Sequence, residues 1–295
     1  MEQMALARAV RGDAARAAPP PALRAWRARL ELGIERRGAA SVLALRRHSG
    51  PLRVQKALYP EGAELAHLVL LHPPAGIAGG DELEIDVHLG AGSLALVTTP
   101  GATKWYRSGG AEARQTVRLV LDAGAALEWL PQEAIVFDGA EAQLDLALEC
   151  ARGARLIGWE MLVLGRRAAA ETFASGCLTQ RVSLYDDGRL LWRERGALEG
   201  GDALFASPAG WDGAHVSGVM WIYGAALDEA LIGHCRTLGE AGLRFGCTRI
   251  GDQLILVRAL SHSAERLRAL FVRLWCAVRP ALLARPAQLP RIWAT

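Results

Sequence analysis

The sequence predicts a mainly β fold, a β-solenoid or helical-sheet scaffold with two α-helices near the C-terminus. Three observations lead to this prediction. Strand patterns follow one another from about Trp26 to Leu204 with no amphipathic helix between them. A motif of small residues before a leucine recurs within that region. Helical patterns are confined to the last third of the chain, so an alternating β/α fold, including the dinucleotide-binding type, is not expected.

Apolar runs and alternation predict the individual strands. Residues 83–89 alternate strictly between apolar and polar side chains, which indicates a strand with one buried face. Residues 65–71 form a short apolar run, and residues 116–121 and 144–148 also suit strands. Turn-forming residues separate these segments, among them Pro100-Gly101, Asp122-Ala123-Gly124, Asp138-Gly139 and Asp187-Gly188.

A weak internal repeat supports the solenoid. Small residues precede Leu94, Leu127 and Leu156, and these leucines are 33 and 29 residues apart. A period near 30 residues fits stacked β-coils, in which each coil buries its apolar face against the next. A β-sandwich with similar turns would give a similar pattern.

The last third has a different pattern. We expect a strand over 215–223, a helix over 227–238, a hairpin of 243–250 with 253–259, and a final helix capped by Ser261 or Ser263. Glu265 falls in its first turn, and an apolar stripe follows at Leu267, Leu270, Leu274 and Val278. The predicted organisation is a tail over residues 1–22, a β-rich scaffold over 23–210 and an α+β part over 211–295, which could pack on the same core.

Composition excludes several classes of protein. The chain has 295 residues, and its net charge of +3 is too small to indicate a nucleic-acid partner. The five cysteines contain no C-x-x-C pair, which favours reduced thiols in the cytoplasm. No apolar stretch is long enough for a membrane helix. Neither the cysteines nor the seven histidines have the spacing of a metal site, and no nucleophile motif such as G-x-S-x-G is present, so nothing indicates an enzyme.

The glycine-rich segment over residues 71–82 is the most unusual in the chain. Its glycines resemble a phosphate loop, but no Gly-Lys-Ser/Thr follows, so a nucleotide site is not expected. One interpretation is a tight crossing between two strands, where glycines allow close backbone contact. The other is a functional site in which Asp81 and Glu82 present oxygen ligands at the start of a strand.

Two further segments combine polar and aromatic residues in the way that binding surfaces do. Residues 98–108 contain hydroxyls, aromatic rings and cations, and a turn with a cation–π pair is the alternative. Residues 129–140 place carboxylates among large apolar groups, where each needs a partner. The candidate partner-binding or motif residues are His72, Lys104, Trp105, Tyr106, Arg107, Glu133 and Asp138.

Taken in order, these segments resemble the urease accessory protein UreD family, called UreH in some organisms. The resemblance runs from about Trp26 to the C-terminus. It departs from the family at Ala75 and before Glu171, at Ala170, where glycine is common. The segments that carry it are Leu70-Leu71-His72-Pro73-Pro74, Gly79-Gly80-Asp81, residues 99–108, Glu128-Trp129-Leu130-Pro131-Gln132-Glu133, Phe137-Asp138-Gly139-Ala140, Gly158-Trp159-Glu160, Leu164-Gly165-Arg166 and Pro290-Arg291-Ile292-Trp293.

The resemblance implies a cytoplasmic scaffold without catalysis of its own. Family members bind apo-urease and the accessory proteins UreF and UreG, of which UreG is the GTPase and carries nickel. The assembly delivers nickel to urease, and an internal water-filled passage through UreD is the proposed route. No tightly bound cofactor is expected, only a nickel ion in transit.

The candidate residues for lining such a passage are Asp81, Glu82 and Glu194. Exchangeable oxygen ligands suit a cation in transit, because paired thiolates and imidazoles would retain it. Glu194 lies between Arg193 and Arg195, a pattern that also suits an exposed alternating strand.

Two other functions compete with a maturation scaffold. A β-solenoid enzyme acting on polysaccharide would need a groove with acids and exposed aromatic rings, for which Trp105, Tyr106, Trp129 and Trp192 are candidates. A secreted enzyme of this type would carry a signal peptide, which the sequence does not show. A purely structural assembly module would bind the same partners without affecting nickel.

Overall fold

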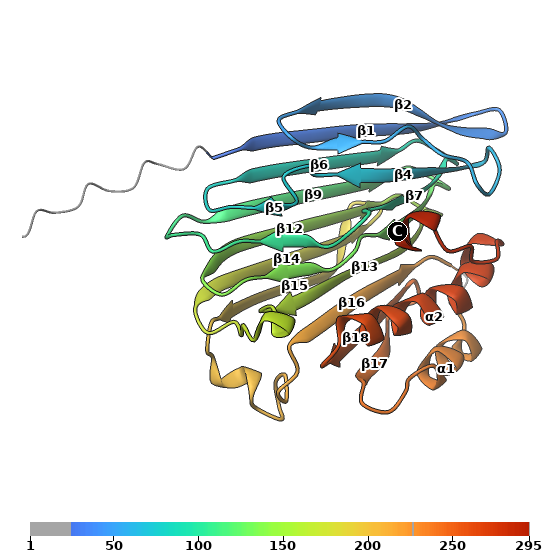
Figure 1. Cartoon of the computed structure of the whole chain (residues 1–295). Coiled ribbons are helices and arrows are strands. Elements are labelled where there is room, and N and C mark those ends of the chain that lie inside the picture. The colour runs from blue at the N-terminus through green and yellow to red at the C-terminus, as the bar shows by residue number, and fades with distance from the viewer. Residues whose placement is uncertain (1–24, 226, 295) are drawn as a thin grey trace, which may run out of the picture.

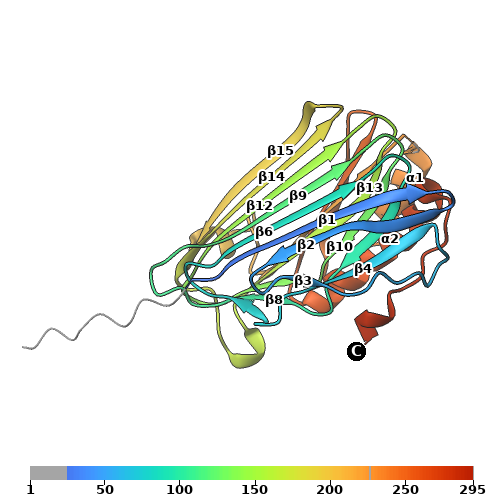
Figure 2. The ribbon, with the colours of Figure 1, turned by 90° about the horizontal axis from the view of Figure 1, so that it is seen from above.

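The computed structural model describes residues 25–225 and 227–294. Two β-sheets face each other, and the chain coils from one to the other (Figure 1). Seen from above, the two sheets form two layers, and both α-helices lie beyond the second sheet (Figure 2). The prediction of a mainly β, solenoid-like scaffold with two helices near the C-terminus is confirmed. The predicted tail over residues 1–22 lies outside the described residues.

The first sheet has seven strands, of which the central five run parallel and the two edge strands pair antiparallel. Its spatial order is β15 (Arg189–Glu199), β14 (Gly176–Asp186), β12 (Ala140–Cys150), β9 (Ala113–Leu121), β6 (Glu82–Leu89), β1 (Arg27–Arg37) and β2 (Ala40–Ser49).

The second sheet has eleven strands. Its main path is β17 (Arg244–Ile250), β18 (Leu254–Ser261), β16 (Val216–Tyr223), β13 (Arg155–Leu164), β10 (Ala126–Leu130), β7 (Leu94–Thr98), β4 (Leu65–Leu71) and β3 (Arg53–Val54). A short branch adds β5 (Gly76–Ile77), β8 (Thr103–Trp105) and β11 (Ala134–Val136). The pairs among β4, β7, β10 and β13 are parallel, as successive coils of a solenoid require.

Stacked turns confirm the internal repeat. Gly92, Gly124 and Gly153 all have positive φ, which glycine adopts without the steric cost of a Cβ. The Gly92 amide donates a hydrogen bond of 3.0 Å to the Ala123 carbonyl of the next turn. Leu127 and Leu156, the residues that open the apolar runs, are direct partners in the pairing of β10 with β13.

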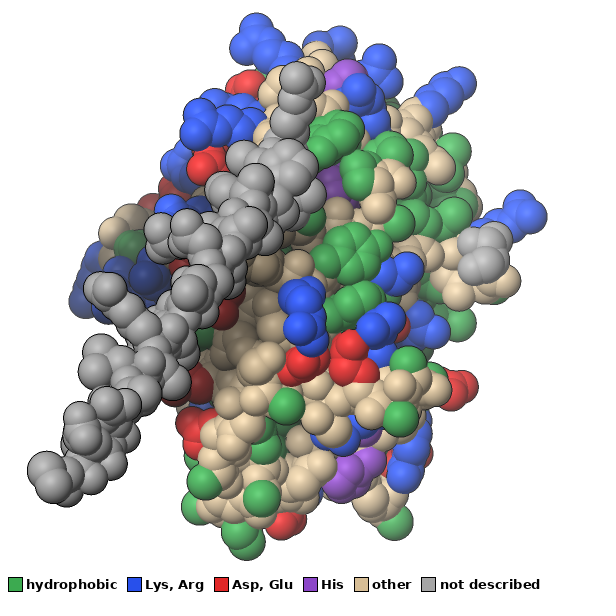
Figure 3. Space-filling model, turned by 60° about the vertical axis from the view of Figure 1, so that its left-hand side comes forward, with side chains coloured by type: hydrophobic (Ala, Val, Ile, Leu, Met, Phe, Trp, Pro, Cys, Tyr) green, Lys and Arg blue, Asp and Glu red, His purple; other side chains and the backbone are tan. Residues whose placement is uncertain are grey.

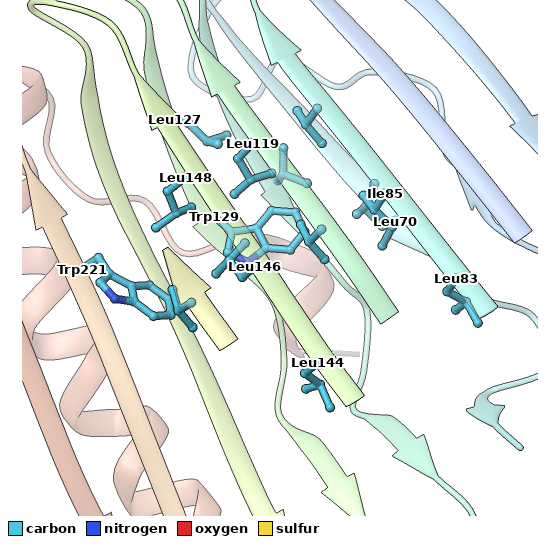
Figure 4. Packing of buried hydrophobic residues seen from close by; sticks show 14 of the residues in the cluster. Leu70, Leu83, Ile85, Leu119, Leu127, Trp129, Leu144, Leu146, Leu148 and Trp221 are labelled. Atoms are coloured by element: carbon cyan, nitrogen blue, oxygen red, sulfur yellow. The ribbon is translucent and has the colours of Figure 1, made fainter. Parts of the chain in front are cut away.

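The main core lies between the two sheets. In β6 the predicted alternation holds, because Leu83, Ile85, Val87 and Leu89 are buried while their polar neighbours face outward. Figure 4 shows leucines from the first sheet meeting Trp129 and Trp221 from the second. Each strand therefore buries its apolar side chains in the layer between the two sheets, and this removal of apolar surface from water stabilises the fold.

The helices cover the outer face of the second sheet and form a second core there. α1 (Glu229–Thr237) is capped by Asp228, and α2 (Ala264–Leu283) is capped by Ser263, one of the two predicted caps. The predicted apolar stripe of α2 is entirely buried. No helix in the described part of the chain is long and apolar enough to cross a membrane. Three 3-10 turns complete the fold: η1 (Arg167–Ala169), η2 (Ala203–Phe205) and η3 (Arg291–Ala294).

The strands of the last third extend the second sheet. β16 pairs antiparallel with β13, and β18 pairs with β16 and with β17. The predicted hairpin is therefore present as β17 and β18. The strands between residues 216 and 261 therefore belong to the same sheet as the coils that precede them.

The two alanines that the resemblance marks as departures both have left-handed backbone. The φ angles of Ala75 and Ala170 are 62° and 56°. We expect Ala75→Gly to raise the free energy of unfolding by about 0.5–1 kcal/mol, because relief of Cβ strain exceeds the entropic cost of glycine. Ala197→Gly is the control at an exposed position of β15, and it should destabilise the protein instead. Urea unfolding measures the free energy of unfolding of both variants. Equal changes in the two variants would contradict the prediction.

A buried ionic cluster ties α2 to the sheet beneath it. Arg279 is completely buried and donates to both carboxylate oxygens of Glu61, at 2.8 and 2.9 Å, and of Glu128, at 2.8 and 3.0 Å. The Trp275 indole donates a further hydrogen bond of 2.6 Å to Glu128. The ring nitrogen Nε2 of His67 lies 2.9 Å from Glu61 Oε1. The cluster therefore joins the loop before β4, strand β10 and the last helix.

The cluster predicts a loss of stability in acid. Burial raises the pKa of Glu61, but hydrogen bonds from His67 and Arg279 outweigh it and lower the pKa to about 2. A carboxyl whose pKa is lower in the folded state stabilises the fold above its unfolded pKa, and this contribution is lost as pH falls from about 5 towards 2. Burial raises the pKa of Glu128, which acts in the opposite sense.

Glu61→Gln isolates the part that belongs to Glu61. In urea unfolding between pH 6 and about pH 2.5, the variant should lose less stability with acid than the wild type. Glu64→Gln is the matched control, because Glu64 is half exposed and pairs with Arg285. An unchanged pH dependence in Glu61→Gln would contradict the prediction.

Candidate functional site

A wide cavity lies between the two sheets where their last strands diverge. Its volume is about 580 Å³. β14 and β15 form one wall, β13, β16 and β18 form the other, and the loop carrying Trp211 closes part of the rim. The wall is mostly apolar, and its ionisable residues are Glu160, Glu194, Arg244 and Arg258.

An inner cavity of about 230 Å³ lies deeper between the coils. Its polar wall residues include His72, Thr99, Gln115 and Gln132. Glu160 and Leu162 line both cavities, so the two spaces meet at these side chains. The two cavities therefore lie on either side of these two side chains within the inter-sheet core, with a carboxyl between them.

Glu160 occupies a position that the strand pattern would assign to an apolar residue. In β13, Leu156, Leu162 and Leu164 face the inter-sheet core, while Trp159 faces the helices. Glu160 lies on the inter-sheet side, and the Gln180 amide of β14 donates a hydrogen bond of 3.2 Å to it across the gap. Burial raises the pKa of Glu160 to about 7, with the Gln180 hydrogen bond opposing the shift.

Glu194 lies at the mouth of the wide cavity. Its carboxylate is 3.0 Å from the Arg258 guanidinium of β18, so this ion pair spans the two sheets. The flanking Arg193 and Arg195 are exposed on the opposite side of β15. The strand does alternate, but its inward side faces a cavity rather than a filled core.

The inner cavity has hydrogen-bond donors in an apolar wall. Within the described residues, Trp105 Nε1 and Trp129 Nε1 are buried and have no hydrogen-bond partner, and His72 Nδ1 is in the same condition. All three residues line this cavity. A buried donor of this kind favours water or another acceptor beside it, and the volume is sufficient for water.

The structure brings neither Asp81 nor Glu82 to these cavity walls. Asp81 is buried, and its two carboxylate oxygens accept hydrogen bonds of 2.8 Å from the Trp26 and Ala78 amides. Glu82 faces outward from β6, 3.5 Å from the Arg27 guanidinium. Glu194 is thus the predicted passage residue that lies in a cavity wall. Contact of any of the three residues with nickel stays a prediction.

The aromatic segment of residues 103–107 mainly organises a crossing between coils. Tyr106 packs against Gly76, where a Cβ would lie 2.2 Å from its ring, and meets Phe137 edge-to-face at 5.2 Å. Trp105 is 1% exposed, and Lys104 beside it is partly exposed. A cation–π contact does lie beside this segment, with Arg166 4.2 Å from the Phe137 ring, but neither partner belongs to residues 98–108, so the alternative of a cation–π turn within the segment is not supported by it.

Asp138 and Glu133 also serve the coil turns. Asp138 accepts hydrogen bonds from the Ala174 and Ser175 amides, at 3.0 and 2.8 Å, and pairs with Arg107 at 2.9 Å. Slight burial raises the pKa of Asp138, but these partners outweigh it and hold the pKa below its usual value. Glu133 is partly exposed, and its carbonyl accepts from the Thr103 amide at 2.9 Å.

The sequence did not predict the roles of Glu160, Gln180 and Arg258. The available signal was a carboxylate within an apolar run, Leu156-Ile157-Gly158-Trp159-Glu160-Met161-Leu162. In residues 25–225 and 227–294, no three His, Cys, Asp or Glu side chains gather as a group that could hold a metal ion. All five cysteines are free thiols. On the face shown in Figure 3, Lys and Arg side chains are scattered among acidic and apolar ones.

Comparisons with known proteins agree with one another. The family model described as "UreD urease accessory protein" matches residues 26–294. A urease accessory protein UreD of Dechloromonas aromatica is 48% identical over 277 residues, which cover 92% of this chain and 95% of that protein. Proteins with the same name from Azoarcus and Pseudomonas aeruginosa are 48% and 47% identical over 271 residues, covering 92% of this chain and 94% and 96% of their own lengths.

Proposed function

The chain belongs to the UreD family of urease accessory proteins, and from this premise we propose that it is a cytoplasmic scaffold for urease maturation. In this proposal it binds apo-urease together with UreF and the GTPase UreG, and nickel passes through it to the urease active site. The observation that carries the proposal is the pair of cavities that meet at Glu160 between the two sheets.

Ligand chemistry supports a route through these cavities. Single carboxylates bind a divalent cation weakly and exchange it readily, whereas clusters of imidazole or thiolate retain it. Glu194 at the mouth would exchange its Arg258 partner for the cation, and Glu160 at the junction offers the next carboxyl. The unpaired donors of the inner cavity favour water, which a hydrated cation needs beside it. Asp81 and Glu82 remain proposed contacts at the outer end of the coils.

The proposal assigns no chemistry to this chain. The names of its relatives describe accessory proteins. In this proposal, GTP hydrolysis belongs to UreG. We expect the purified chain to show no GTPase activity and to bind nickel with a Kd on the order of micromolar, roughly −8 kcal/mol. Nanomolar affinity would instead indicate a nickel store.

The polysaccharide enzyme is less well supported. Trp105 and Trp129 are 1% and 4% exposed, so their faces are not available to stack on a sugar. Trp192 packs towards Trp221 at 6.3 Å between ring centres. Of the rings proposed for sugar binding, two are therefore core residues.

Affinity purification from nickel-free cells tests the scaffold. Tagged chain should co-elute with apo-urease and UreF, and both should be absent when an unrelated tagged protein is used. Failure to recover urease subunits under these conditions would contradict the proposed function.

Variants at predicted passage residues test nickel delivery. In a deletion strain, Glu194→Ala or Glu82→Ala should leave co-elution with the partners intact and lower the nickel content of urease severalfold. Glu84→Ala is the control, because Glu84 lies on the outer face of β6 with its side chain 59% exposed. Unchanged nickel in urease would remove the substituted residue from the route. A nickel-replete urease in the uncomplemented strain would favour the purely structural module.

A further inference from the structure

Gln180 lies directly across the inter-sheet gap from Glu160, at the junction of the two cavities. Its Nε2 atom donates to Glu160 Oε2 at 3.2 Å, and this hydrogen bond joins β14 to β13. The two strands belong to different sheets and are not paired with each other. The contact is thus a polar cross-link inside an apolar layer.

The surrounding residues make this position unusual. Leu178 and Val182, which flank Gln180 on the same side of β14, are buried leucine and valine that line the wide cavity. An apolar residue at position 180 would continue that row and help to fill the gap. The chain instead places a side chain there that has both an N–H donor and a carbonyl oxygen.

Hydrogen bonding to a buried carboxyl explains one end of the Gln180 amide. The hydrogen bond to Glu160 uses the amide nitrogen of Gln180, and the amide oxygen is bonded to the same carbon atom. Rotation about the last side-chain bond exchanges the two ends at little cost, because this torsion is broad. The amide then presents oxygen instead of N–H to whatever the Glu160 carboxylate holds.

The two cationic residues that line the wide cavity both have acidic partners, so neither neutralises Glu160. Arg258 of β18 is paired with Glu194 at 3.0 Å. Arg244 pairs with Asp212 at 3.1 Å. On the inner side, Arg268 contacts Gln132, and His72 lies on the far wall.

We propose that Gln180 is a positioning residue that closes the junction through its hydrogen bond to Glu160 and opens it by turning its amide oxygen to a divalent cation held by that carboxylate. This inference rests on the proposed function, since it names the gate of the same route. The pair supplies two oxygen ligands from opposite sheets, and the rest of the coordination shell is left to water. Such a site holds a cation briefly and releases it to either cavity.

Nickel titration of the purified full-length chain by calorimetry tests the gate. Gln180→Glu places a second carboxylate opposite Glu160, so it should bind Ni²⁺ about tenfold more tightly than the wild type. In the deletion strain the same variant should lower the nickel content of urease, because the cation is retained. Gln180→Met keeps the volume, removes the oxygen and should weaken Ni²⁺ binding about threefold.

Gln55→Glu is the matched control for added charge. Gln55 is an exposed residue that follows β3 and lines neither cavity, so this variant should bind Ni²⁺ as the wild type does. A purely structural role for Gln180 predicts no gain of affinity in Gln180→Glu. If that variant does not fold, as judged by circular dichroism, the Met variant decides.

The outcomes separate the gate from the route. Unchanged affinity in both Gln180 variants, with weaker binding in Glu160→Gln, would overturn the gate and leave the route. Unchanged affinity and unchanged urease nickel in all three variants would overturn both.

Discussion

Arg279→Ala should lower the free energy of unfolding by about 3–5 kcal/mol, because it leaves two buried carboxyls without their cation. Arg279 donates to both oxygens of Glu61 and of Glu128, and its guanidinium is 0% exposed. The substitution also removes its cation–π contact with Trp275, whose ring centre is 5.2 Å away. A buried pair that loses one member costs far more than an exposed pair.

Urea unfolding followed by tryptophan fluorescence measures this effect. Arg273→Ala on the same helix is the matched control, since Arg273 pairs with Glu240 at 3.4 Å and its side chain is 37% exposed. That variant should lose less than about 1 kcal/mol. A loss of similar size in both variants would show that the cluster adds nothing beyond an ordinary ion pair.

Glu160→Gln should reduce the nickel content of urease about tenfold when the variant replaces the wild type in a deletion strain. The substitution keeps the volume and the polar contact with Gln180, but it removes the negative charge at the junction of the two cavities. Loss of a group that only orients a metal ligand typically costs 10- to 100-fold in metal affinity, so loss of a charged oxygen ligand should cost at least tenfold. The route would then lack its innermost carboxylate.

Metal analysis of purified urease measures the result, with co-elution of urease and UreF as the check that the scaffold still assembles. Glu84→Ala provides the same control as for Glu194. Full nickel occupancy with Glu160→Gln would exclude the junction from the route, even if the protein is confirmed as a scaffold by its partners.

More of the fold than of the candidate site could be predicted from the sequence. Alternation in β6, the stacked turns at Gly92, Gly124 and Gly153, and the stripe of α2 each follow from local periodicity, which the chain carries in its sequence. The role of Asp81 could not be predicted in this way. Its carboxylate binds the Trp26 amide, 55 residues away, and only the folded coil brings the two together.

Glu160 and Glu194 are a second case in which local sequence patterns did not predict the role of a residue. Both lie on strands whose polarity pattern suits several environments. Their meeting at one cavity depends on the long-range pairing of β16 with β13 and on the β14–β15 hairpin that lies opposite these strands. The carboxyl of Glu160 could be recognised in the sequence as out of place in an apolar run, but the strand facing it could not.

The buried cluster also bears on biosynthesis. Glu61 and Arg279 are 218 residues apart, and Glu128 and Arg279 are 151 residues apart. A ribosome that has made the coils up to β13 has produced both acids but not yet their cation, so the nascent scaffold emerges with an incomplete outer layer. Completion must wait until the last helix leaves the exit tunnel, and truncated translation products should therefore be targets for proteolysis and aggregation rather than partial substitutes for the full-length protein.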